Sequence, residues 1–168
     1  YDKCKSRLPD DYLLWHNKVP PTKDREIDFV ILHPSYGVWV IEVKDWRANQ
    51  IRRLAERTCE IVRAGKLENA RNPLHQSWQN SKAVMELLRS DTSLRHRSGR
   101  HKGKLAVPVN HFAVLTNITA DDIAENHWGA KWPSEQVWYS DFVACPFVSE
   151  SEWEKRLLAT RTYRFDCS

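Results

Sequence analysis

The cysteines of this chain do not form a cluster. Its four cysteines lie far apart and include no C-x-x-C pair, at Cys4, Cys59, Cys145 and Cys167. A zinc site needs four ligands brought together, usually in part through short spacings along the chain. We therefore expect no zinc, and we expect free thiols of the kind found in a reducing cytoplasm.

Long apolar runs are also missing. None approaches the roughly 20 residues that a membrane-spanning helix needs, so we expect no membrane partner. No Walker-type glycine loop and no Ser-His-Asp arrangement stands out. No secretory leader is visible, and the chain opens on Tyr1 rather than Met. We expect an excerpt of a longer cytoplasmic protein, in which absent targeting signals carry little meaning.

What is present favours one globular domain. The chain has 168 residues, of which 41% are hydrophobic, and its eight tryptophans supply much of the packing volume. The formal net charge is +4. This mild excess of positive charge is compatible with a polyanionic partner without identifying one.

The strand and helix signals alternate along the chain. Residues 26–32 and 38–44 are rich in β-branched and aromatic residues, which favours two strands joined by a hairpin loop at 33–37. Asn72 followed by Pro73 predicts a helix start, and the helix is expected to reach about Arg89. Other expected strands are 12–16, 107–116, 136–139 and one or two short ones within 50–63; other expected helices are 119–127 and 149–160. This mixture predicts an α/β fold with a mixed central sheet flanked by helices.

The predicted hairpin brings three charged side chains together. A loop centred on residues 33–37 places Asp28 directly opposite Glu42, where Cβ atoms are about 5 Å apart. Side chains alternate faces along a strand, so Lys44 points the same way as Glu42. The other face is expected to hold apolar side chains, from Phe29, Ile31, Trp39, Ile41 and Val43.

Two carboxylates facing each other in apolar surroundings destabilise a hairpin unless a cation binds between them. Hard oxygen ligands suit Mg²⁺ or Mn²⁺, which can activate water and neutralise charge on a phosphate. Lys44 would then act on that water or stabilise the anionic transition state. The simpler alternative is that Lys44 neutralises Asp28 and Glu42 at a sheet edge, because E-x-K is a common surface string.

The segment REIDFVILHPSYGVWVIEVKDW strongly resembles the core of the nuclease-related domain, or NERD domain. Asp28, Glu42 and Lys44 match that family's pattern of an aspartate strand, a glycine turn and an E-x-K strand. The stretch NPLHQ resembles its N-P-x-x-Q helix start, and LAVPVNHFAVLTNIT its later strand. The likeness runs from about Asp10 to the final helix. The NERD family is placed in the PD-(D/E)xK superfamily. Ile27 stands where that name has a proline.

This resemblance implies a restriction-endonuclease-like fold and a nuclease activity dependent on Mg²⁺ or Mn²⁺. It implies metal binding by Asp28, Glu42 and the backbone carbonyl of Val43, with Gln76 facing the active site. Gln79 and Asn80 are weaker candidates. NERD domains often carry a further glutamate on an upstream helix, which the chain begins too late to include. The likeness is greatest to NERD domains fused ahead of a superfamily 1 DNA helicase in bacteria, so a helicase domain is expected downstream.

Basic residues supply candidate contacts to a phosphate backbone. The densest run is the loop at 92–104, and Lys23 and Arg25 precede the strand that bears Asp28. The candidates in the loop are Arg95, Arg97, Arg100, Lys102 and Lys104. Charge runs are as often simply solvated, so both interpretations stay open for this loop.

The sequence thus predicts residues 1–168 to be one metal-dependent nuclease domain that hydrolyses DNA, in repair or in defence against foreign DNA. The alternative is a non-catalytic DNA-binding or docking module that serves an attached helicase. A second alternative is an enzyme that cuts RNA. Metal binding separates the first alternative from the nuclease, and a comparison of substrates separates the second.

Overall fold

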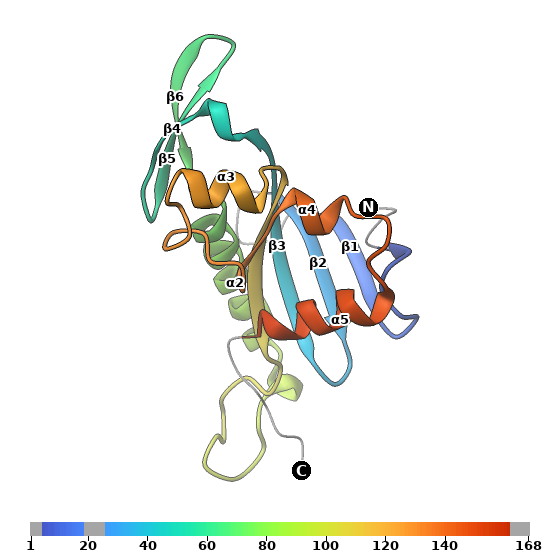
Figure 1. The fold of residues 1–168 in the computed structure, drawn as a ribbon. Helices are drawn as coiled ribbons and strands as arrows, with labels where there is room; N and C mark the ends of the chain where they lie inside the picture. Colours follow the sequence, from blue (N-terminus) through green and yellow to red (C-terminus); the bar gives the residue numbers. More distant parts are fainter. Residues whose placement is uncertain (1–4, 19–25, 162–168) are drawn as a thin grey trace.

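The computed structural model describes residues 5–18 and 26–161 and has an α/β fold (Figure 1). A five-stranded mixed sheet has the strand order β1-β2-β3-β7-β8. The pairs β1–β2 and β2–β3 are antiparallel, whereas β3–β7 and β7–β8 are parallel. The bounds of these strands are β1 Leu13–Lys18, β2 Ile27–His33, β3 Gly37–Arg47, β7 Val109–Asn117 and β8 Val137–Trp138.

A second, antiparallel sheet stands beyond the upper end of β3 in Figure 1. Its strands are β4 Ile51–Leu54, β5 Thr58–Arg63 and β6 Lys66–Arg71. The α-helices are α2 Pro73–Ser90, α3 Ala120–Glu125, α4 Ser140–Val143 and α5 Glu150–Ala159, with short 3-10 turns at Ala48–Gln50 and Thr92–Leu94. In the part of the chain that the structure describes, no helix is both long and apolar enough to cross a membrane.

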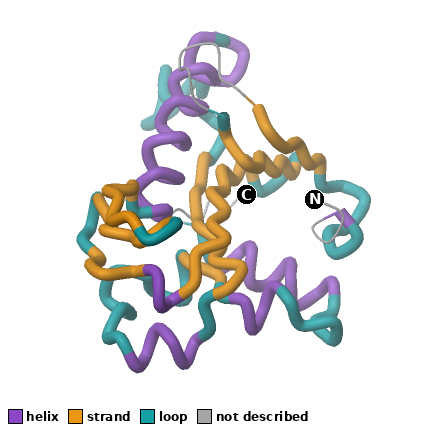
Figure 2. Tube along the Cα trace, turned by 90° about the horizontal axis from the view of Figure 1, so that it is seen from above, coloured by secondary structure: helices purple, strands orange, loops and turns teal. Residues whose placement is uncertain are grey.

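The central sheet is covered on both faces. Helix α2 packs on β3 and β7 from one side, and α5 lies on the opposite side, as the two views show (Figures 1 and 2). Trp153 and Leu157 of α5 join Trp39 and Ile41 of β3 in one buried cluster. Val84 of α2 joins a second cluster on the other face, with Ile27, Val38, Val40 and Val109.

The β2–β3 hairpin has the predicted register as far as Phe29 and Ile41, but the predicted pairing of Asp28 with Glu42 is not formed. Leu32 pairs with Val38, and Val30 pairs with Val40. The aromatic and aliphatic side chains expected on one face all lie in the α5-side cluster, from Phe29, Ile31, Trp39, Ile41 and Val43. Glu42 and Lys44, which alternate with them, therefore belong to the face that α2 covers.

The predicted helix starts are confirmed by their caps. Asn72 Oδ1 accepts a hydrogen bond from the N–H of Leu74 at 3.0 Å, one residue past Pro73. Thr119 and Asp122 exchange the two bonds of a capping box at the start of α3. Ser149 and Glu152 do the same for α5. These bonds satisfy N–H groups that a helix start leaves without intrahelical partners.

Strand β6 was not predicted. Its sequence, KLENAR, has no apolar alternation, and its first four residues are exposed. It forms because Ala64 and Gly65 both adopt positive φ, 47° and 75°, in a two-residue turn after Arg63. Such a turn twists in the sense that a hairpin needs, and main-chain pairing with β5 then builds a strand without a hydrophobic face.

Candidate active site

The antiparallel pairing of β2 with β3 stops just before the charged residues. Its last pair is Phe29 with Ile41. Beyond it, Asp28 Oδ2 accepts a hydrogen bond from the backbone N–H of Val43 at 2.7 Å. The acceptor for the N–H of Val43, beyond the last paired residues, is thus the side chain of Asp28. The half-buried Asp28 carboxylate is thereby fixed between the two strands.

Glu42 lies at the same point, under α2, with only 1% of its surface exposed. Lys44 Nζ donates to Glu42 Oε1 at 2.5 Å. Burial nevertheless raises the pKa of the Glu42 carboxyl to about 7, against the opposing effect of Lys44, and the nearby Asp28 raises the pKa further. The cost of removing this carboxylate from water therefore exceeds the stabilisation by its lysine.

The predicted trio is therefore brought together. Asp28 is close enough for its charge to raise the pKa of the Glu42 carboxyl. Lys44 reaches Glu42 from two residues along the same strand face. The Lys44 ammonium also lies 5.9 Å from the centre of the Trp46 ring, which bounds it on the side toward the second sheet.

Helix α2 contributes an amide from Asn80 to this cluster. Asn80 is 4% exposed, and its Nδ2 lies 3.5 Å from Glu42 Oε2 as a long hydrogen bond. Gln76, the stronger prediction, is half-buried one turn earlier, and at a spacing of four residues it shares this flank of the helix. The i, i+4 relation to Gln76 is the sequence signal that favours Asn80, but only the packed helix shows which amide reaches Glu42.

The oxygen atoms at this point suit a hard divalent cation. The N–H of Val43 points toward Asp28, and the C=O of a strand residue points to the same side as its N–H. Two carboxylates and the Val43 carbonyl thus face one region. Across the described ranges, no group of three or more His, Cys, Asp or Glu residues could hold a metal ion. Mg²⁺ fits such a sparse set, because it usually keeps several waters and takes one or two carboxylates.

The basic loop lies elsewhere. Val38 N–H donates to Pro108 O at 2.8 Å, and Val109 pairs with Val38, so the loop joins the sheet where β3 begins. Lys44 pairs with Leu115, six residues further along, which is roughly 20 Å at the usual strand rise. The candidates Arg95, Arg97, Arg100, Lys102 and Lys104 are therefore not part of the carboxylate cluster.

This loop is also more ordered than its composition suggests. Arg95 pairs with Leu105 in a β-bridge, and Arg95 Nε donates to the carbonyl of Arg89 at 3.1 Å. Arg95 thus ties the loop to the end of α2, whereas the side chains of Arg97 and Arg100 are exposed. The remaining basic candidates, Lys23 and Arg25, lie outside the described residues.

Asn72 and Pro73, from the second motif, support the structure around the site. Asn72 is 1% exposed and its amide makes three bonds. Its Nδ2 donates to Ala55 O at 2.9 Å, and its Oδ1 accepts from Trp132 Nε1 at 3.0 Å as well as from the start of α2. This residue therefore connects the helix that covers Glu42 to the second sheet and to a buried tryptophan.

Comparisons with known proteins agree with this geometry. The family model described as "Nuclease-related domain", NERD, matches residues 1–116, which include β2, β3 and α2. No curated protein and no solved structure gave a significant match.

Proposed function

Since the chain belongs to the nuclease-related domain family, we propose that it is a divalent-metal-dependent nuclease that hydrolyses phosphodiester bonds in DNA. The observation that carries this proposal is the meeting of Asp28 and Glu42 where the β2–β3 pairing ends, with Lys44 bonded to Glu42 on the same strand face. Burial raises the pKa of the Glu42 carboxyl despite its lysine, and a bound cation would offset the cost of that buried charge.

Asp28, Glu42 and the carbonyl of Val43 are the proposed ligands for Mg²⁺ or Mn²⁺. When bound, this cation supplies positive charge that lowers the pKa of a water and neutralises charge on the phosphate. Hydrolysis joins the water oxygen to phosphorus and breaks one P–O ester bond, and the leaving oxygen takes up a proton. Lys44 is proposed to hold a phosphate oxygen, and its hydrogen bond to Glu42 fixes the direction of its ammonium group. Asn80 and Gln76 orient Glu42 and the substrate from α2.

The direct test is cleavage of DNA by the purified chain with Mg²⁺ or Mn²⁺. Glu42→Ala and Lys44→Ala are expected to lower the rate by on the order of 100-fold or more. Asp45→Asn is the matched control, because Asp45 is exposed and alternates to the opposite face of β3. Cleavage that survives both changes, or that needs no divalent cation, contradicts the proposed site.

One observation favours the non-catalytic alternative, a DNA-binding or docking module. The ion pair between Lys44 and Glu42 already neutralises part of the cluster, as a structural pair would. Calorimetry separates the two: the nuclease is expected to bind Mn²⁺ and to lose that binding in Asp28→Asn, whereas the docking module binds DNA without a metal. Comparing DNA with RNA of the same sequence tests the RNA-cleaving alternative.

The proposed setting is DNA repair or processing, or defence against foreign DNA. A helicase domain in the same polypeptide is part of this proposal, and it rests on the sequence resemblance alone. Sequencing the gene on both sides of this segment tests it. A downstream P-loop would support the fusion, and an upstream helical glutamate would supply a further metal ligand.

A further inference from the structure

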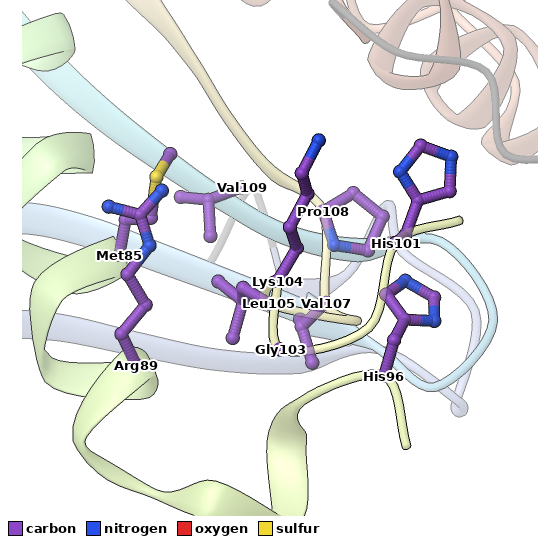
Figure 3. Close-up of a pocket in the computed structure, with 10 residues that line it drawn as sticks. All are labelled: Met85, Arg89, His96, His101, Gly103, Lys104, Leu105, Val107, Pro108 and Val109. Atoms are coloured by element: carbon purple, nitrogen blue, oxygen red, sulfur yellow. The ribbon is translucent and has the colours of Figure 1, made fainter. Parts of the chain in front are cut away.

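A hollow lies near the end of the sheet that is away from the carboxylate cluster. A pocket of about 540 Å³ is enclosed by the last turns of α2, the ordered loop after it and the start of β7. Figure 3 shows Met85 and Arg89 on one side of this pocket and the two histidines on the other, with Leu105 and Val107 between them. Its lining is Met85, Arg89, His96, His101, Gly103, Lys104, Leu105, Val107, Pro108 and Val109.

The lining combines apolar side chains with basic ones and includes no carboxylate. Met85, Leu105, Val107 and Val109 provide the apolar surface. Arg89 and Lys104 provide the permanent charges, and none of the ion pairs between described residues involves either of them. The rings of His96 and His101 lie 5.9 Å apart and add further donors. These charges are therefore open to an anion from outside the chain.

The pocket is formed in advance by main-chain bonds. His96 N–H donates to Lys104 O and Gly103 N–H donates to His96 O, both at 2.9 Å, while Ala106 N–H donates to Leu94 O at 2.7 Å. The basic side chains thus stand on a folded loop rather than on a free one. A ligand pays less ordering entropy when it binds to such a prepared site.

We propose that this pocket binds one nucleotide unit of a single-stranded nucleic acid. The base lies against the apolar side chains, and Arg89 and Lys104 hold the adjoining phosphate. An inorganic anion alone would leave the apolar lining uncovered, and the volume lies within the usual range of small-ligand sites. This inference rests on the proposed function, and it adds a holding site roughly 20 Å along the sheet from Lys44.

The test is binding of a fluorescein-labelled oligothymidylate, followed by anisotropy in EDTA so that no cleavage occurs. Arg89→Ala and Lys104→Ala are each expected to weaken binding about tenfold, because each loses a charge-assisted bond. Each is also expected to lower the slope of log K against log salt by about 0.7. The matched control is Arg63→Ala, which removes one exposed charge from the end of β5, away from the pocket. Circular dichroism checks the fold of every variant.

Competition identifies what the pocket recognises. Thymidine monophosphate is expected to displace the oligonucleotide from the wild type and not from Arg89→Ala, while inorganic phosphate and thymidine displace it poorly. Equal losses of affinity in Arg89→Ala, Lys104→Ala and the control would contradict the proposed binding site. So would equal competition by inorganic phosphate, and either result would indicate a diffuse basic surface. Because binding is measured in EDTA, this assay requires neither a bound divalent cation nor cleavage. Failure of cleavage and failure of this inference are thus separate results.

Discussion

The carboxylate of Asp28 accepts the backbone N–H of Val43 at 2.7 Å, across the opening between β2 and β3. This bond links the first acidic residue of the cluster to the residue that separates Glu42 from Lys44. Any shift of one strand along the other would break it, so the hydrogen bond and the register of the hairpin support each other. The site is therefore built into the sheet rather than carried by a loop.

The two amides of α2 are expected to differ in their effects. Asn80→Ala should weaken Mn²⁺ binding by about 10–100-fold, because Asn80 orients the Glu42 carboxylate. Gln76→Ala should lower the cleavage rate with metal affinity unchanged, because its proposed role is toward the substrate. Calorimetry and single-turnover kinetics measure the two quantities. Lys82→Ala, on the exposed side of the helix, is the control. Unchanged metal affinity in Asn80→Ala would contradict its role.

Glu42→Gln is expected to stabilise the fold while abolishing activity. The neutral amide avoids the cost of burying a charge, which a pKa near 7 puts at up to about 3 kcal/mol at pH 8. Urea denaturation in EDTA measures the difference. Adding Mg²⁺ should reduce this difference in stability between Glu42→Gln and the wild type, because only the wild type gains stability from the metal. Glu68→Gln, on the exposed part of β6, should change little. A less stable Glu42→Gln would show that the pair with Lys44 is net favourable.

Gly37 is the position where a side chain is least tolerated. Its φ is +93°, and an added Cβ would lie 2.3 Å from the carbonyl oxygen of Pro108. Gly37→Ala should lower the free energy of unfolding by more than the 1–3 kcal/mol typical of a strained backbone alone. Gly65→Ala is matched in φ, at +75°, but meets nothing within 4 Å. Gly65→Ala should therefore lower the free energy of unfolding by clearly less than Gly37→Ala. Equal losses would mean that contact with Pro108 adds nothing.

The sequence was sufficient to predict the hairpin and its charged face. Alternating residues and a loop centred on Ser35 define the register without tertiary information. The sequence indicated Gln76, Gln79 and Asn80 as candidates but could not predict which amide reaches Glu42. The packing of α2 on β3 and β7 decides that. The sequence also could not predict the distance between the basic loop and the trio of Asp28, Glu42 and Lys44. It follows from the parallel pairing of β3 with β7, which sequence patterns do not specify.

His111 is expected to make the fold sensitive to acid. Burial lowers its pKa to about 4, from 6.5, so the folded chain prefers the neutral imidazole. The contribution of neutral His111 to the free energy of unfolding is complete above pH 6.5. It is lost as the pH falls from 6.5 toward 4, because the unfolded chain binds the proton first. The cavity beside it is lined by other charged or titratable residues, Glu56, Arg57, His75 and Lys131.

Between pH 7 and pH 5, the free energy of unfolding should fall by about 2 kcal/mol through His111 alone. In His111→Gln this part of the loss should be absent, because glutamine carries no titrating group. His127→Asn is the control, since His127 is exposed and its φ of 58° suits asparagine. Urea denaturation of the three proteins at the two pH values measures the difference. If His111→Gln loses as much stability as the wild type, the acid sensitivity arises from other groups.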